Sequence, residues 1–379
     1  MKKIRIFGKV LLSLLLCLVM LPCTAFAVGF DEVYHVGDTT TAFGGIVLDT
    51  AVDADFTRMS AVTDNATAFL NSTCYENTLN TPVPMYNLNE EIEALYYPLQ
   101  PAGYLIASYK DGHVIEFSPE GQRFTDTSGK LYYNGIMEYY KAIDDEQLVQ
   151  ALSNDKVNKG NLQNVFNETA LKQIPSYDYQ PSISTYGLEP TNPTPIEANC
   201  VRTTTEYHCV ITAVTNLLQY YHDFMGADVY ASNVSSATSL RKFLGEGGPN
   251  NGYIYTGDVR LHLIADSHNI GGKVSSGLRF YFRRSDVDTY SVNAFGDGKI
   301  SINEIKTQLN SYARPVILAM NSSAVDSTKT GRHAVLAYTY METANTTYFI
   351  TNDSWGNNHV YICAEDIIIA GLRALYIAA

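Results

Sequence analysis

The chain has 379 residues, an apolar fraction of 46% and a formal net charge of −13 at pH 7. This acidic balance argues against binding to nucleic acid or to an anionic membrane surface. The length exceeds what one hydrophobic core usually serves, so two domains are expected.

The N-terminus has the pattern of a secretory signal peptide. Four basic residues precede an apolar run at 10–21, and Ala25 and Ala27 flank Phe26 as at a signal-peptidase site. We therefore predict a signal peptide over residues 1–27 and free secretion of the mature chain. Loss of the four basic residues lowers the net charge from −13 to −17. The apolar run is too short for a membrane span, and no later stretch is long enough.

A proline-rich segment divides the remaining chain. Prolines recur between 175 and 195 without any sustained apolar period, which predicts an exposed, extended linker over residues 173–198. The segment 28–172 is predicted to be a small α+β domain, with strands at 83–88, 103–109 and 113–118 and helices at 56–73 and 145–154. Asp111-Gly112 is the expected hairpin turn. His35 and His113 are interpreted as isolated surface or strand-edge histidines.

Residues 199–379 are predicted to form a leading helix packed on an antiparallel sheet. Apolar residues at spacings of three and four follow Cys209, as on a helix with one buried face. A second helix is expected at 302–312 and a strand at 316–320. Strands at 334–340 and 347–351 should form a hairpin that turns near 343–346. Short segments at 361–362 and 375–377 should add edge strands.

Cys209 is the candidate nucleophile of this region. It lies in the first turn of the predicted helix, where unpaired N–H groups and the helix dipole favour a thiolate. The alternative is that Cys209 is a small buried hydrophobic residue, as most unpaired cysteines are.

His333 and Asp353 are the candidate base and orienting group. His333 immediately precedes an apolar strand, and Asp353 and Trp355 follow the returning strand. With the hairpin centred between 344 and 345, paired residue numbers sum to about 689, so all three lie at the same end of the hairpin. Trp355 would exclude water from the contact between His333 and Asp353. Alternatively, His333 ends a strand and Asp353 begins an ordinary turn.

The cysteine pattern indicates neither a disulfide scaffold nor a metal site. After removal of the signal peptide four cysteines remain, namely Cys74, Cys200, Cys209 and Cys363. A Cys200–Cys363 disulfide stays open. Because no Cys-x-x-Cys or His-x-x-x-His spacing occurs, no metal and no cofactor are predicted.

Several motifs resemble those of secreted papain-fold cysteine peptidases, closest to the streptopain group and the bacterial double-glycine-peptidase-like (C39-like) proteins. The segment 209–221 is similar to their nucleophile helix, Cys-x-x-Thr-Ala with a Tyr-Tyr end. The segment 304–317 resembles their helix, Arg-Pro and apolar strand. The segments 331–335 and 352–356 are similar to Gly-His-Ala-Val and Asn-Ser-Trp-Gly.

The resemblance implies a papain-like fold and a thiol peptidase. Cys209 would be the nucleophile, His333 the base, Asp353 its orienting group and Trp355 the shield over that pair. Segments 84–88, 103–108 and 115–121 look like a streptopain-type propeptide, which implies a zymogen whose own propeptide is an intramolecular inhibitor. The expected partner is a protein or peptide substrate, and the expected state is a monomer.

The sequence departs from the family pattern at two positions. Thr203 stands where papain-type enzymes place an oxyanion-binding glutamine, so the second donor would be Asn199, Thr203 or a group from elsewhere. Arg332 separates the family's Gly-His pair. Two other functions therefore stay open: a catalytically inactive interaction protein on the same fold, and a transglutaminase-like acyl transferase with the same Cys, His, Asp order.

Overall fold

A computed structural model describes the residues 50–121, 124, 126–151, 154, 156–162, 171, 173–187, 209–232, 234–244, 274–295, 299–320, 333–369 and 372–378. The predicted signal peptide, Asn199 and Thr203 lie outside these residues. Contacts within the chain separate residues 1–49 from a compact unit of residues 50–379, and all described residues belong to the latter. Among the described helices, none is long and apolar enough to cross a membrane.

The first half of the chain, residues 28–172, contains one long helix followed by short strands. Its described elements are α2 (Thr50–Ser72), β1 (Thr78–Leu79), β2 (Val83–Tyr86), β3 (Ile92–Gln100), β4 (Tyr104–Ser108), β5 (Val114–Ser118), β6 (Leu131–Tyr133), β7 (Tyr139–Ala142), β8 (Gln147–Gln150), β9 (Lys156–Asn158) and the 3-10 turn η1 (Lys159–Asn161).

Within the second half, residues 199–379, the described part begins with a helix and ends in strands, as predicted. The described elements after the first half are β10 (Pro181–Gly187), α4 (Cys209–Met225), α5 (Ala237–Lys242), α6 (Ser275–Tyr281), β11 (Ser291–Phe295), α7 (Ile302–Ser311), β12 (Val316–Met320), β13 (His333–Thr343), β14 (Thr347–Asn352), β15 (Val360–Cys363), α8 (Ala364–Ile369) and β16 (Arg373–Ala378).

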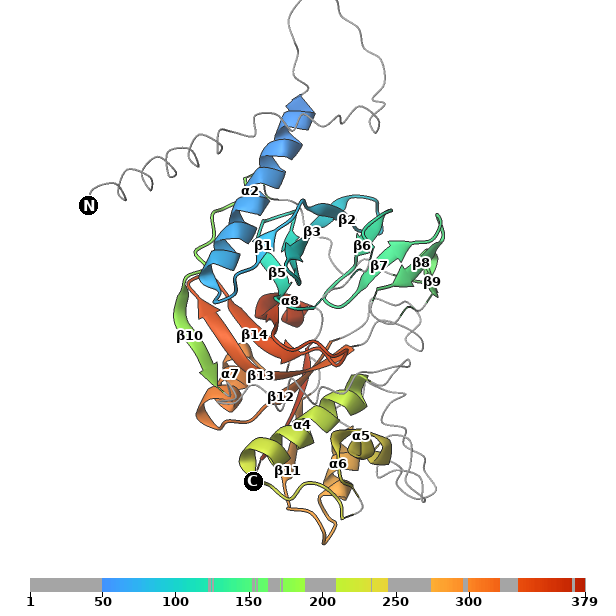
Figure 1. Ribbon diagram of the computed structural model, residues 1–379, viewed down its shortest axis with the longest axis vertical. Coiled ribbons are helices and arrows are strands. Elements are labelled where there is room, and N and C mark those ends of the chain that lie inside the picture. The colour runs from blue at the N-terminus through green and yellow to red at the C-terminus, as the bar shows by residue number, and fades with distance from the viewer. Residues whose placement is uncertain are drawn as a thin grey trace, which may run out of the picture. The chain divides into compact units, whose positions relative to one another are not determined.

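One sheet runs through both halves (Figure 1). Its described strands follow the order β11-β16-β12-β13-β14-β15-β5-β4-β3-β2-β6-β7-β8-β9. The halves join where β15 pairs antiparallel with β5, with Tyr361 opposite Phe117 and Ile362 opposite Glu116. The result is a mixed α/β structure with a large sheet and few helices, which is compatible with the predicted papain-like fold. The boundaries 28–172 and 199–379 remain predictions.

Part of the predicted linker is a strand. β10 pairs antiparallel with residues 339–343 of β13, whereas β12 pairs with residues 333–337 of the same strand. Because β12 is shorter than β13, residues 339–343 of β13 extend beyond it. The main-chain N–H and C=O groups of these residues pair with β10 instead. Residues 181–187 of the predicted linker are therefore extended, as expected, and they are also paired in the sheet.

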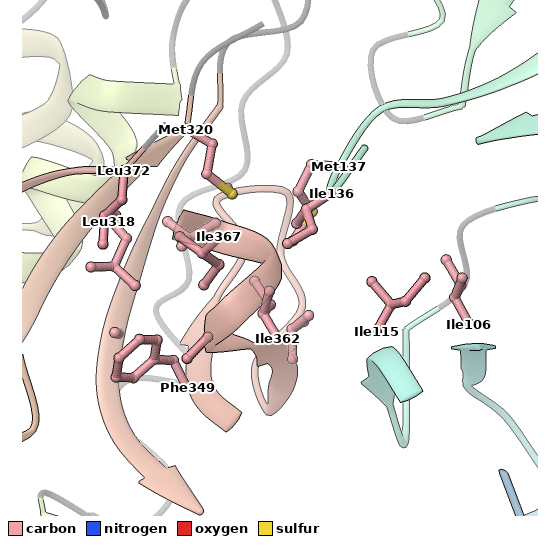
Figure 2. Close-up of a cluster of buried hydrophobic side chains, with 14 of the residues drawn as sticks. Ile106, Ile115, Ile136, Met137, Leu318, Met320, Phe349, Ile362, Ile367 and Leu372 are labelled. Atoms are coloured by element: carbon pink, nitrogen blue, oxygen red, sulfur yellow. The ribbon is translucent and has the colours of Figure 1, made fainter. Parts of the chain in front are cut away.

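The hydrophobic core is shared between the halves. Figure 2 shows one buried cluster in which Ile106 and Ile115, from β4 and β5, accompany Phe349, Ile362 and Ile367 from the second half. A second cluster surrounds α4. A third contains Phe69 of α2 together with aromatic residues of both halves. Burial of this apolar surface, rather than strand pairing alone, stabilises the junction.

The predicted elements agree with the structure best where the apolar pattern is long. The helices at 56–73 and 302–312, the strand at 316–320 and the hairpin at 334–351 are confirmed. The helix at 145–154 is wrong, because residues 147–150 form β8 between β7 and β9. The segments at 361–362 and 375–377 are strands, but they lie inside the sheet and not at its edges.

Candidate active site

Cys209 is the first residue of helix α4, as the sequence predicts. The apolar face of this helix packs into a buried cluster that also contains Ala334 of β13. The helix N-terminus is thereby held against the start of β13. Unpaired N–H groups and the helix dipole favour a negative charge at this position.

The Cys209 thiol is nearly enclosed, with 6% of the residue exposed. Burial raises the pKa of this thiol to about 11, because a thiolate would lose its hydration, whereas the N–H groups of Ala334, Val210 and Cys209 itself act in the opposite direction. The thiol is therefore protonated at neutral pH in this structure. Ala334 directly follows His333 in the sequence, so the Cys209 sulfur lies one residue away from the candidate base along β13.

The hydrogen bond of His333 defines its tautomer. His333 is the first residue of β13, and only 3% of it is exposed. Its Nε2 atom lies 2.7 Å from the main-chain oxygen of Asp353. A carbonyl oxygen can only accept, so Nε2 carries the hydrogen. In the neutral ring the lone pair is then on Nδ1, and the imidazole can act as a base through that atom.

Trp355 stacks on the imidazole of His333. The two ring centroids are 3.6 Å apart and the planes are inclined by 26°. The indole covers one face of the histidine ring and excludes water from that face. This contact restricts the orientation of the ring in addition to its hydrogen bond.

Asp353 contacts His333 through its main chain. The Asp353 carboxylate accepts hydrogen bonds from the N–H groups of Trp355 (2.8 Å) and Asn357 (3.0 Å) and from Asn357 Nδ2 (2.6 Å). These bonds shape the loop after β14 and direct the Asp353 carbonyl oxygen to the imidazole. The predicted residue is thus at the ring, and its carboxylate positions the loop that supplies the acceptor.

A buried asparagine pair links the nucleophile helix to this loop. Asn216 Nδ2, two turns after Cys209, donates to Asn352 Oδ1 at 2.8 Å. Asn352 Oδ1 also accepts from the Ser354 N–H at 3.0 Å, and Ser354 Oγ donates to the Ala334 carbonyl at 3.0 Å. Sequence reasoning missed this network. The sequence feature that could have indicated it is the polar residue Asn216, which precedes Leu217 in the buried part of the predicted helix.

The predicted oxyanion donors Asn199 and Thr203 lie outside the described residues. Within the described part, the N–H groups of Cys209 and Val210 are close enough to the sulfur to lower its pKa. First-turn N–H groups point out of the helix end, which is the orientation needed to donate to an oxyanion formed beside the sulfur.

A second cluster of ionisable side chains lies where the halves meet. His113 Nδ1 is 2.7 Å from Asp111 Oδ1, and His113 Nε2 is 2.8 Å from Asp366 Oδ2. Cys363 is a buried free thiol. The interpretation of His113 as isolated is wrong. Because His113 and Asp366 are far apart in sequence, no spacing motif could reveal this cluster.

Residues 192–368 match the model of the Peptidase_C39 like family. The matched stretch is slightly less than half of the chain, and it contains Cys209, His333 and Asp353. The match supports a C39-like cysteine peptidase family and indicates cysteine peptidase activity. None of the curated proteins matches this chain significantly.

Proposed function

We propose that the chain is a secreted bacterial cysteine peptidase, made as a zymogen, that hydrolyses peptide bonds with Cys209, His333 and Asp353. The observation that carries the proposal is the packing of Cys209 in one buried cluster with Ala334, the residue directly after His333, whose main chain acts on the pKa of the thiol. The family match over the same stretch supports this chemistry.

Catalysis follows from the tautomer of His333. Nδ1 accepts the thiol proton as the Cys209 sulfur attacks the carbonyl carbon of the peptide. The C–N bond then breaks, the leaving amine takes that proton, and a thioester remains on the sulfur. His333 next accepts a proton from a water molecule as its oxygen attacks the thioester carbonyl carbon; the C–S bond breaks, the carboxylic acid product leaves, and His333 returns the proton to the sulfur. The Asp353 carbonyl holds the Nε2–H group throughout.

Cys363 is a weaker candidate for the nucleophile. Both ring nitrogens of its neighbour His113 are bonded to carboxylates, which accept hydrogen bonds. Burial alone would lower the pKa of His113, but Asp366 and Asp111 hold it well above its usual range. A ring that carries both hydrogens has no lone pair with which to accept a thiol proton. His113 also lies outside the stretch that matches the family.

One contact favours the first half as an intramolecular inhibitor. Gly121 of the first half packs against Asn357, the residue that binds the Asp353 carboxylate; a Cβ at Gly121 would lie 2.9 Å from Asn357 Cγ. Activation therefore requires cleavage in the linker and then release of a first half that is paired through β5 and β15.

The test is labelling with a thiol-directed peptide electrophile after the first half has been removed by limited proteolysis. We expect one label on Cys209, located by peptide mass mapping, and loss of both label and peptide hydrolysis in Cys209→Ala. Cys200→Ala and Cys363→Ser are matched controls that should retain both. Equal loss in Cys200→Ala, or a label on Cys363, would contradict the assignment.

The same experiment separates the alternative functions. Absence of any label on the folded, trimmed protein would favour an inactive interaction protein. Transfer of the acyl group to an added amine, in place of hydrolysis, would favour an acyl transferase. Secretion is tested separately, by N-terminal sequencing of exported protein, which should begin at or near residue 28.

A further inference from the structure

Three side chains of metal-binding type meet where the loop between β4 and β5 approaches α8. His113 immediately precedes β5, Cys363 ends β15, and Asp366 lies in the first turn of α8. One ligand atom from each residue lies within 4.8 Å of the other two. We propose that these residues bind one Zn²⁺ ion, which joins the first half of the chain to the second.

The strand pairing explains why these residues meet. In the antiparallel register of β5 and β15, Glu116 lies opposite Ile362. The start of β5 therefore lies beside the end of β15, which places His113 level with the residues that follow Cys363. Helix α8 begins directly after Cys363 and carries Asp366 back toward the imidazole, as the 2.8 Å contact shows.

Asp111 supports the metal-binding orientation of His113. His113 Nδ1 lies 2.7 Å from Asp111 Oδ1, so this ring nitrogen donates to the carboxylate, and Nε2 faces Asp366 Oδ2 at 2.8 Å. A carboxylate on the far nitrogen of a histidine is the usual outer partner of a metal-bound imidazole, because it orients the ring and makes it a stronger donor. Asp111 would therefore affect affinity without touching the ion.

The ligand set matches zinc better than calcium or magnesium. Thiolate, imidazole and carboxylate are the common zinc ligands, with bonds of about 2.0–2.3 Å, whereas the harder cations prefer oxygen alone. Glu365 Oε2, 3.3 Å from Cys363 Sγ, can supply the fourth ligand after a side-chain rotation. Binding displaces the Cys363 thiol proton and the hydrogen on His113 Nε2, both of which pass to solvent.

The surroundings combine burial with access. Cys363 is 2% and Asp366 7% exposed, whereas the His113 side chain is 18% exposed. A surface pocket of about 470 Å³ is bordered by Glu365 and Thr346, and Thr346 Oγ1 is 3.6 Å from Cys363 Sγ. An ion could therefore reach the sulfur through this pocket, which is consistent with a site loaded after folding.

The consequence concerns the junction of the halves. An ion held by His113 of the first half and by Cys363 and Asp366 of the second would oppose separation of β5 from β15. Insofar as the chain is the proposed zymogen, zinc would stabilise its latent form. Zinc binding itself does not depend on peptidase activity, so the two proposals can fail separately.

The test uses the full mature chain in a Cys209→Ser background, because this removes the second buried cysteine among the described residues. Metal-free protein is titrated with Co²⁺, followed by absorption, and with Zn²⁺, followed by calorimetry. We expect one ion per chain, a thiolate-to-cobalt absorption band and a higher melting temperature with Zn²⁺. A chain that binds neither ion would overturn the proposal.

Variants locate the ion. Cys363→Ser should abolish the thiolate band, and His113→Gln and Asp366→Asn should weaken zinc binding by at least about tenfold; Asp111→Asn should weaken it by about 10- to 100-fold. Cys74→Ser and His222→Gln, which change exposed residues of the same types, should bind normally. Circular dichroism establishes that each variant is folded. If Cys363→Ser does not fold, the zinc affinity of His113→Gln decides the question. Unchanged binding in folded His113→Gln would overturn the proposal.

Discussion

Asn216 of helix α4 donates a hydrogen bond to Asn352 at the end of β14, with an Nδ2 to Oδ1 distance of 2.8 Å. Both side chains are buried, with 4% and 0% of the residues exposed. The bond spans 136 positions of the sequence and ties the helix that carries Cys209 to the loop whose carbonyl holds His333. The relative position of the candidate nucleophile and base thus depends on a polar contact between two elements.

Asn216→Ala should lower both stability and catalysis. Loss of one buried hydrogen bond is expected to cost about 1–2 kcal/mol of unfolding free energy. Because the loop would then be less well positioned, we expect kcat/KM to fall about tenfold or more, mainly through kcat. Urea unfolding and steady-state kinetics measure the two effects. Asn310→Ala, at an exposed position of α7, is the control and should change neither.

Trp355→Ala should reduce activity more than Trp355→Phe. The indole stacks on the His333 ring at 3.6 Å, and such aromatic contacts contribute about 0.5–1.5 kcal/mol beyond burial. We therefore expect kcat/KM to fall up to about tenfold in Trp355→Ala, with partial retention in Trp355→Phe. The pH profile should shift as water reaches the Nε2–H bond. Identical kinetics and pH profiles in all three proteins would show that the stack plays no part.

The reactivity of Cys209 should increase steeply with pH in the intact chain. Burial raises the pKa of its thiol from 9.0 to about 11, so alkylation at neutral pH should be about a hundredfold slower than for an ordinary thiol. The rate should increase about tenfold per pH unit and level off only near pH 11, because the thiolate is the reactive form. Iodoacetamide labelling of the Cys209 peptide, followed by mass spectrometry between pH 7 and 10, measures this.

A plateau of that labelling rate already near pH 7 would contradict this expectation, since it would mean a thiolate paired with a charged His333 in the intact chain. After removal of the first half we expect the curve to move to lower pH. That shift would be the signature of release from inhibition.

Phe69→Ala should destabilise the junction of the halves. Phe69 of α2 is fully buried. Its ring centroid lies 5.4 Å from that of Phe117 in the first half and 5.0 Å from that of Tyr348 in the second. The cavity left by its removal is expected to cost about 3–5 kcal/mol. Phe56→Ala, on the same helix but 75% exposed, should change stability by less than about 0.5 kcal/mol. Similar urea midpoints for the two variants would contradict this account of the core.

Local pattern was sufficient for much of the second half. The apolar period after Cys209 predicted α4, and the two apolar strands with a turn near 343–346 predicted a hairpin whose pairs sum to about 689, as Tyr340 and Phe349 do. A shift between Ala337 and Thr339 changes this register farther from the turn. These elements could be predicted because each is a long, mostly apolar and buried segment, which gives a stronger local signal than a short one.

Short, locally ambiguous segments were predicted less well. Residues 147–150 were expected to be helical, but they form β8, because pairing with both β7 and β9 outweighs a weak local preference. Likewise, the pattern at 361–362 could not distinguish an edge strand from β15, whose second neighbour, β5, lies far away in the sequence.

The sequence by itself determined which residues carry the candidate chemistry: a cysteine at a helix N-terminus, and a histidine and an aspartate at one end of a hairpin. Only the tertiary structure decided how they meet. It placed the Asp353 carbonyl, not its carboxylate, on the His333 ring, and it assembled His113, Cys363 and Asp366 from distant segments. Periodicity reports which face of one element is buried, whereas contacts between elements depend on packing that no local pattern encodes.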